Sequence, residues 1–535
     1  MQRFWQLLAL TIAGVMLAPV FVALGSVFSS AGEVWQHISV YVLPRVALNT
    51  LLLVVAVALM TLLIGTVAGW LTAVCEFPGR RFFAWSLMLP LAIPGYVIAF
   101  ALAGIFQYGA PLATGLRSLG IELPEFNAGS ASALCLALTL YPYVFLLARQ
   151  AFMTQGAQGL EVAQSLGMSK TRGFFMVALP LARPWLVAGV ALVIMETLAD
   201  FGTVKVFNFD TFTTAIYSAW FGLFSLTAAL QMSVMLLALV LVALVLERRA
   251  RGQRRFSTTQ VKSAQPRIAL NGGRRIAATM FCVVLFVLAF ALPVVQLLVW
   301  AMNHFQQELS QRYLTFLRAS LVLSGLACGL ITGLSVLLGF SRRQSPGKIT
   351  ATSERLATLG YALPGTVLAV GFFVALAGLQ QALTGGLRLL TGNPESVVML
   401  TGTLWVMVLA YAARFLAVAH SPVGSAFERV TPPIDDAARG LGVRGWALLK
   451  RVYLPILRPG MATALLLVFV DVMKELPITL ITRPFGWDTL AVRIFQMTTE
   501  GEWERASVPA LAIVICGLLP VLWLHKRSVR HEVSA

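Results

Sequence analysis

The sequence predicts an all-α polytopic membrane protein of about 12 transmembrane helices, built as two fused six-helix halves in a parallel pseudo-two-fold repeat. Only 12% of the 535 residues are charged and the mean hydropathy is +0.83, whereas soluble domains carry about 25% charged residues. Apolar runs of the length that crosses a bilayer recur along the chain, and a polar motif occurs twice at a fixed offset. The bilayer must therefore solvate much of this chain.

Twelve apolar runs reach the length of about 20 residues that a spanning helix needs. The first run lies close to Met1 and resembles a secretory signal peptide, but it exceeds the ~7–15 apolar residues of a signal core, so we expect an uncleaved helix. The predicted spans are residues 5–29, 47–75, 82–106, 128–152, 185–204, 223–247, 276–303, 316–341, 354–381, 396–420, 460–482 and 506–525.

The net charge of +18 indicates orientation in the membrane rather than a nucleic-acid partner. With the N-terminus inside, the cytoplasmic loops hold about 29 of the 40 Lys and Arg residues and the outer loops about 9, which is the bias that membrane proteins show. The segment from Arg248 to Arg275 alone holds nine basic residues and no acidic one. We therefore expect both termini to be cytoplasmic, in the inner (plasma) membrane of a bacterium.

The cysteines and histidines predict no catalytic or metal site. The five cysteines lie in or beside apolar stretches without a CxxC pair, as small buried hydrophobic residues do. The five histidines are scattered over outer loops, one span end and the C-terminal tail. No nucleophile and base stand in a recognisable pattern, so a membrane-embedded enzyme is not favoured.

A repeat divides the chain into two halves. The motif that starts at Glu161 recurs at Asp436, and every matched position is 275 residues apart; upstream, Pro94-Gly95 matches Pro364-Gly365 at an offset of 270. Six predicted spans separate the two copies of the motif, so both copies face the same side of the membrane. The expected divisions are a first half at 1–247 with its loop at 153–184, a basic linker at 248–275, and a second half at 276–535 with its loop at 421–459.

The repeated motif reads acidic-x-Ala-x3-Gly-x9-aliphatic-x-Leu-Pro and resembles the EAA loop of ABC importer permeases of the MetI-like type I fold. Each copy is too polar to span and predicts a short helix that a glycine ends in a left-handed turn. In the resembling family this helix docks in a cleft of the ATPase and transmits its motion. The resemblance assigns ATPase coupling to Glu161, Ala163, Gly167, Asp436, Ala437, Ala438 and Gly442, and the small alanines are expected to permit close approach.

The chain lacks the Gly-x4-Gly-Lys-[Ser/Thr] phosphate loop, so it is expected to be a transport subunit that binds no cofactor while ATP is used by another subunit. The resemblance implies as partners a cytoplasmic ABC ATPase homodimer, a periplasmic substrate-binding protein and membrane lipid, with one permease chain per complex. An ion-coupled secondary transporter is the alternative class, since it would also have twelve spans but would need no docking helices.

Four acids within predicted spans indicate a path for a cation, because charge inside a membrane is costly and marks function by default. The pairs are four residues apart, are themselves related by the offset of 275, and are expected to share one helical face: Glu196 with Asp200, and Asp471 with Glu475. Hard cations prefer such oxygen ligands. The alternative is that these acids lie at helix ends and pair with Lys205 or Lys474.

Two stretches favour iron(III) as the cargo. Residues 195–220 and 472–493 resemble the ferric-iron branch of these permeases, with the outer-loop residues Asp210 and Tyr217 as weak metal candidates. Thiamine-type permeases share the fused layout, so thiamine or another small cationic solute is the alternative within the same class. Pro94-Gly95 and Pro364-Gly365 are expected to be either kink points or packing features.

Overall fold

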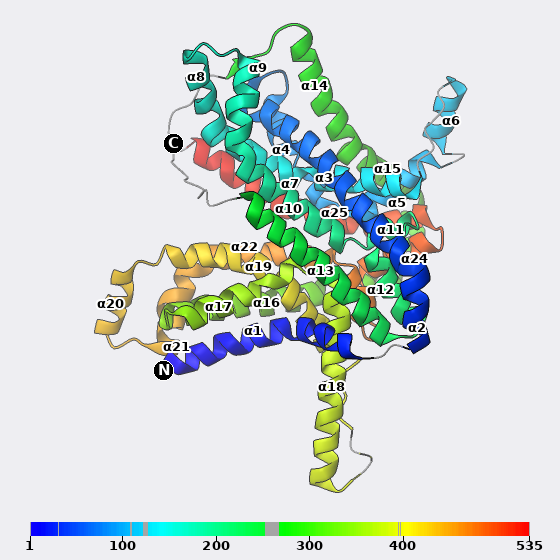
Figure 1. The fold of residues 1–535 in the computed structure, drawn as a ribbon, viewed down its shortest axis with the longest axis vertical. Helices are drawn as coiled ribbons and strands as arrows, with labels where there is room; N and C mark the ends of the chain where they lie inside the picture. Colours follow the sequence, from blue (N-terminus) through cyan, green and yellow to red (C-terminus); the bar gives the residue numbers. More distant parts are fainter. Residues whose placement is uncertain are drawn as a thin grey trace. The chain divides into compact units, whose positions relative to one another are not determined.

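A computed structural model describes residues 2–29, 32–107, 110–120, 127–251, 267–393, 395 and 397–533 (Figure 1). Almost all of the described chain is helical, and the short strands β1 (Cys75–Glu76) and β2 (Ile268–Ala269) pair in parallel. Much of the expected basic linker, residues 252–266, lies outside the described residues.

The helices fall on either side of the basic segment. Those before it are α1 (Gln2–Gly25), α2 (Gly32–His37), α3 (Leu43–Val74), α4 (Arg80–Ser86), α5 (Gly95–Phe106), α6 (Pro111–Ser118), α7 (Ala128–Ala151), α8 (Ala157–Ser165), α9 (Lys170–Gly173), α10 (Leu179–Ala199), α11 (Gly202–Val206), α12 (Phe212–Phe221) and α13 (Leu226–Arg251). Those after it are α14 (Gly273–Phe286), α15 (Leu292–Glu308), α16 (Gln311–Gln344), α17 (Lys348–Ala357), α18 (Gly365–Thr391), α19 (Leu404–Glu428), α20 (Pro432–Gly440), α21 (Gly445–Leu448), α22 (Leu454–Met473), α23 (Pro477–Thr482), α24 (Leu490–Thr499) and α25 (Trp503–Val533). Short 3-10 or π-helical turns are η1 (Ser26–Phe28), η2 (Ile38–Val42), η3 (Leu89–Ala92), η4 (Phe152–Gly156), η5 (Phe174–Ala178), η6 (Val287–Ala291), η7 (Thr358–Ala362) and η8 (Leu449–Tyr453).

The number of spans confirms the predicted fold class. Among the described residues, 11 helices are long and apolar enough to cross a membrane, and a bent pair of helices gives the twelfth. This pair is Arg80–Ala92 with Gly95–Phe106, and its two parts meet at 97°. The bend lies at Pro94-Gly95. This dipeptide is therefore a kink point, which is one of the two roles that the sequence predicted for it.

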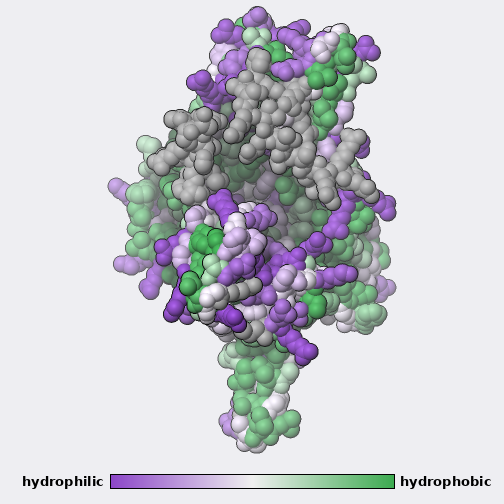
Figure 2. Space-filling model, turned by 90° about the vertical axis from the view of Figure 1, so that its left-hand side faces the viewer, coloured by the Kyte–Doolittle hydropathy of each residue, from purple (hydrophilic) through white to green (hydrophobic). Residues whose placement is uncertain are grey.

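Apolar side chains cover much of the surface, as lipid contact requires. The C-terminal part of α18 is an example, since Leu383 is 45% exposed and Leu389 and Leu390 are each 88% exposed. Figure 2 shows the end of the molecule that α18 forms as largely hydrophobic. In water such a surface would be an aggregation hazard, whereas in a bilayer it carries no such cost.

The contacts divide the chain into two compact units, and each unit takes segments from both sides of the basic linker. Unit 1 comprises residues 1–37, 215–237 and 309–495, and unit 2 comprises residues 38–214, 238–308 and 496–535. These units follow contacts and not the sequence repeat, so the expected half boundaries at 247 and 276 stay predictions.

In unit 1, α16, α19 and α22 pack together, and α1 lies against α16, α17 and α18. Trp5 of α1 meets the ring of Phe340 edge-on, with 4.9 Å between the ring centroids. Gly371 lets α18 approach α1 closely, because a Cβ there would stand 2.4 Å from Cβ of Pro19. The first span is thereby built into a core that is formed mainly by helices from the second half of the sequence.

In unit 2, α3 and α7 form the main helix pair, and α10 packs against both. Gly65 and Gly69, spaced as Gly-x3-Gly, face α7 so closely that a Cβ would stand 2.7 Å from Cβ of Val144 and 2.8 Å from Cβ of Ala148 respectively. Small residues at such contacts let helix backbones approach in a membrane, where no hydrophobic force between helices is available.

Four predicted spans are displaced in the structure. Those expected at 354–381 and 396–420 are the helices Gly365–Thr391 and Leu404–Glu428, which begin and end later. The spans expected at 185–204 and 460–482 are the helices Lys170–Ala199 and Gly445–Met473, which begin earlier and end sooner. After each end the chain breaks and a short helix follows, α11 in one case and α23 in the other. Apolar composition continues through both breaks, and for this reason hydropathy alone placed the helix ends wrongly.

Candidate functional site

The first copy of the repeated motif forms α8 and ends as expected. The amide of Met168 donates to the carbonyl of Ala163 at 2.9 Å, and the amide of Gly167 donates to the carbonyl of Gln164 at 2.9 Å. Gly167 has φ +82°. These bonds and this left-handed residue form a Schellman motif, which satisfies carbonyls at the helix end.

The second copy forms α20 and ends in the same way. The amide of Val443 donates to the carbonyl of Ala438 at 2.9 Å, and Gly442 has φ +77°. No atom lies within 4 Å of the position that a Cβ would take at Gly167 or Gly442. Glycine is therefore required at both positions by backbone conformation and not by close approach of a neighbour.

The side chains of both helices divide into an inward and an outward set. Ala163 and Ala438 are 2% and 6% exposed, so they pack against their own chain and are not open to a partner, contrary to the expectation for these alanines. Glu161, Asp436 and Ala437 are exposed. The outward set also contains apolar side chains that the sequence reasoning missed, namely Val162 at 60%, Leu166 at 74% and Leu441 at 82% exposure.

The position of Leu166 and Leu441 in the repeat was the signal that could have identified them. They are 275 residues apart, and each is an apolar residue in an otherwise polar loop. A solvent-exposed leucine directly before the terminal glycine of a helix has no packing role in its own unit. Each of the helices α8 and α20 therefore exposes an acidic and an apolar side chain.

Asp435 ties α20 to the rest of unit 1, and the sequence reasoning assigned it no role. Its carboxylate accepts a hydrogen bond from Nε of Arg343 at 2.9 Å and another from the hydroxyl of Tyr453. Nη2 of Arg343 also donates to the carbonyl of Val430 at 2.8 Å. The positions that correspond to Asp435 and Tyr453 in the first copy are Leu160 and Ala178, so α8 lacks these partners.

Asp200 and Glu475 cap the short helices that follow the two breaks. The Asp200 carboxylate accepts from the amide of Val204 at 3.1 Å and from the hydroxyl of Thr203 at 2.9 Å. The Glu475 carboxylate accepts from the amides of Ile478 at 3.0 Å and Thr479 at 3.2 Å. A carboxylate at a helix N-terminus satisfies unpaired amides.

The expected placement of each acid pair on one helical face is therefore wrong. Asp200 stands outside α10, with ψ 132°, and Glu475 lies beyond the end of α22. Asp471 pairs with Lys474, whose Nζ lies 2.8 Å from its carboxylate, and Glu196 is half-buried within α10. This geometry matches the alternative in which the acids belong to helix ends.

Each Pro-Gly dipeptide lies beside the capping acid of its own unit. A Cβ on Gly95 would stand 2.6 Å from Oγ1 of Thr203 and 3.6 Å from the Asp200 carboxylate. A Cβ on Gly365 would stand 2.5 Å from Nη1 of Arg414 and 2.9 Å from Oε1 of Glu475. In each unit, therefore, the chain break at the Pro-Gly dipeptide lies next to the chain break at the capping acid.

The weak metal candidates have other partners. Asp210 lies 3.8 Å from Nη2 of Arg45, and the ring of Tyr217 packs on Phe221 with 4.9 Å between centroids. Across the described part of the chain, no group of three or more His, Cys, Asp or Glu side chains is placed to hold a metal ion.

Comparison with known proteins adds independent information. The Fe(3+)-transport system permease protein FbpB 2 of Haemophilus influenzae is 26% identical to this chain over 98% of this chain and 99% of that protein. The thiamine transport system permease protein ThiP of Escherichia coli is 26% identical over 83% of this chain and 82% of that protein. The putative 2-aminoethylphosphonate transport system permease protein PhnV of Salmonella typhimurium is 27% identical over 48% of this chain and 96% of that protein.

A family model for the inner membrane component of binding-protein-dependent transport systems matches the chain twice, at residues 62–252 and 325–531. The two matches together cover more than half of the chain, and each includes one copy of the repeated motif and one capping acid. The multiple spans, the duplicated motif and the duplicated match all agree. The chain belongs to the family of binding-protein-dependent transport system inner membrane components, and it is a permease subunit of an ABC importer.

Proposed function

We propose that this permease carries iron(III) from a periplasmic binding protein into the cytoplasm, driven by a separate ATPase dimer. The observation that carries the proposal is the similarity to an iron(III) permease along 98% of this chain and 99% of that relative. A thiamine permease aligns over 83% of this chain, which keeps thiamine as the second candidate cargo.

The two docking helices supply the coupling to ATP hydrolysis. Each helix exposes one leucine, Leu166 or Leu441, and one acid, Glu161 or Asp436, so each helix fits a cleft with apolar and basic groups. One chain carries both helices, which suits one permease chain on an ATPase homodimer. In this arrangement ATP is bound by the partner and no cofactor by the permease.

The breaks at Asp200 and Glu475 are where the path is expected to open and close. Helix breaks that are stabilised by capping acids change angle without leaving amides unpaired in the membrane. In this proposal Glu196 and Asp471, the members of the pairs that lie within α10 and α22, face the passing cation, while Asp200 and Glu475 keep the breaks in place. Alternating access then follows from rotation about the breaks when the ATPase closes.

The proposal has a direct test in proteoliposomes that contain the permease and its ATPase. Labelled iron(III) on its binding protein is supplied outside and ATP inside, and thiamine on its own binding protein is the matched comparison. We expect ATP-dependent uptake of iron(III) and none of thiamine. Uptake of thiamine without uptake of iron(III) would identify thiamine as the cargo. Uptake without ATP would indicate a secondary transporter.

One variant with two conservative substitutions tests the path of the cation. Glu196→Gln combined with Asp471→Asn removes two charges and keeps side-chain size, so we expect iron uptake to fall about tenfold or more, since each charge lost from a cation site costs ~1 kcal/mol or more. ATPase binding to the membrane should persist, because the docking helices are untouched. Unchanged uptake in this double variant would remove both acids from the path.

A further inference from the structure

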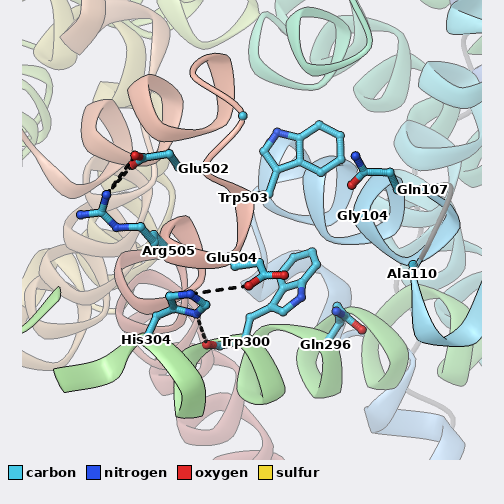
Figure 3. A pocket seen from close by; sticks show the side chains of 11 residues that line it. Gly104, Gln107, Ala110, Gln296, Trp300, His304, Glu502, Trp503, Glu504 and Arg505 are labelled. Atoms are coloured by element: carbon cyan, nitrogen blue, oxygen red, sulfur yellow. Dashed lines mark hydrogen bonds and ion pairs between the residues drawn. The ribbon is translucent and has the colours of Figure 1, made fainter. Parts of the chain in front are cut away.

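Unit 2 contains a polar cavity. It has a volume of about 520 Å³ and lies between the C-terminal ends of α5 and α15 and the N-terminal end of α25 (Figure 3). Its wall contains the indoles of Trp300 and Trp503, the imidazole of His304 and the charged side chains of Glu502, Glu504 and Arg505. None of these residues belongs to the repeated motif or to the acid pairs.

Both indole rings pack against Gly104. A Cβ on Gly104 would stand 2.3 Å from the Trp300 ring and 3.4 Å from the Trp503 ring, so the rings occupy the volume that a larger residue would need. Trp300 is 8% exposed, and the indole nitrogen of Trp503 donates to the carbonyl of Thr498 at 3.0 Å. The cavity therefore has rigid apolar walls before any partner binds.

The cavity carries surplus negative charge. Arg505 donates to Glu308 through Nε at 2.5 Å and to Glu502 through Nη1 at 2.9 Å, so its guanidinium is already shared by two carboxylates. Glu504 adds a further carboxylate, with 59% of its side chain exposed. Since Arg505 is shared by two carboxylates and Glu504 is a third, the negative charge at the cavity favours a cationic ligand.

The neighbouring histidine leaves Glu504 able to bind a ligand. Nδ1 of His304 lies 3.1 Å from the carbonyl oxygen of Trp300, which holds the ring in place. Nε2 lies 3.6 Å from the Glu504 carboxylate, which is longer than a hydrogen bond. Glu504 therefore keeps its capacity to accept hydrogen bonds from a ligand.

The location of the cavity identifies the side from which a ligand comes. The span Gly273–Glu308 begins beside the basic segment and ends at the cavity. If the basic segment is cytoplasmic, as the charge bias predicts, the cavity opens on the outer face. A bare metal ion is not the expected ligand, because among the described residues no group of three or more His, Cys, Asp or Glu side chains is placed to hold one.

We propose that this cavity receives a lysine or arginine side chain of the periplasmic binding protein, as one anchor of its docking on the permease. The aliphatic stem would pack on Trp300 and Trp503, and the cationic head would meet Glu504. Buried aromatic walls around a charged contact are typical of the few residues that carry most of the energy of an interface. The inference rests on the proposed function, because it requires a binding protein.

The test measures uptake as a function of the concentration of loaded binding protein, in proteoliposomes with the ATPase. Glu504→Gln keeps shape and removes charge, and we expect the apparent affinity for the binding protein to weaken about tenfold, more than the maximal rate does. Glu504→Lys should weaken it further, and reversal of one basic residue on the binding protein to glutamate should restore it. Glu395→Gln changes another exposed carboxylate, which is not among the residues that line the cavity, and should leave the affinity unchanged.

Each other outcome contradicts the inference. Unchanged affinity in both Glu504 variants would overturn it. A lower maximal rate at unchanged affinity would also overturn it, since the cavity would then act on the transported cation. Failure of the unmodified complex to take up cargo with ATP and binding protein would instead overturn the proposed function, so the two failures are distinguishable.

Discussion

Gly365 has no room for a side chain beside two charged groups. It opens α18 directly after Pro364, and a Cβ there would stand 2.5 Å from Nη1 of Arg414 and 2.9 Å from Oε1 of Glu475. Both atoms belong to charged groups inside the membrane region, and Nη1 of Arg414 is buried without a hydrogen-bond partner. A methyl group would push apart charges that no water can then solvate.

We therefore expect Gly365→Ala to destabilise the protein by about 1–3 kcal/mol, the usual cost of overpacking. The matched control is Gly378→Ala in the same helix, where nothing lies within 4 Å and alanine should be neutral or stabilising by about 0.5–1 kcal/mol. The measurement is the thermal unfolding midpoint of the detergent-solubilised chain. Equal midpoints for the two variants would show that the contacts at Gly365 relax without cost.

At the scale of the element, the left-handed turns that end α8 and α20 decide how the docking helices are presented. A side chain at φ near +80° costs about 1–2 kcal/mol, and asparagine tolerates this conformation better than alanine. We expect Gly167→Ala with Gly442→Ala to lower ATP-driven uptake several-fold, and the Asn pair to restore much of it. Gly440→Ala, at a helical position of α20 with open space, is the control that should keep full uptake.

The two docking helices are held differently, and this predicts a difference in their stability. Asp435→Asn removes the charge that Arg343 and Tyr453 contact, at a cost of about 1.5–3 kcal/mol for hydrogen bonds to a charged group. We expect faster trypsin cleavage around α20 and unchanged cleavage around α8. Asp436→Asn, at the neighbouring exposed position, should leave both cleavage rates unchanged. If it accelerated cleavage as much as Asp435→Asn does, the contacts of Asp435 with Arg343 and Tyr453 would not be what holds α20.

Local patterns in the sequence predicted the turns and the kink, because these depend on residues that are adjacent in the chain. The glycine turns after α8 and α20 and the kink at Pro94-Gly95 follow from residues that are adjacent in sequence. The clamp on α20 joins Asp435 to Arg343, 92 positions away, and no periodicity reports such a contact. The breaks at Asp200 and Glu475 were missed because apolar composition continues through them, although Thr203 and Thr479 three and four residues later are what a capping acid needs.

At the scale of the whole molecule, the parallel repeat makes a prediction about sidedness. Six spans separate the copies of the motif, so Leu166 and Leu441 must lie on the same side of the membrane, and Glu395 on the other. The native cysteines are mostly buried, so single cysteines at these three exposed positions can be labelled selectively in a cysteine-free background.

A membrane-impermeant maleimide should label Leu166→Cys and Leu441→Cys in inside-out vesicles only. Glu395→Cys should be labelled in right-side-out vesicles only. Since one ATPase dimer works from one side, both docking helices must be reachable from that side for a single chain to couple to it. If Leu166→Cys and Leu441→Cys reacted from opposite sides, the repeat would be inverted, and no arrangement of one cytoplasmic ATPase dimer could engage both helices.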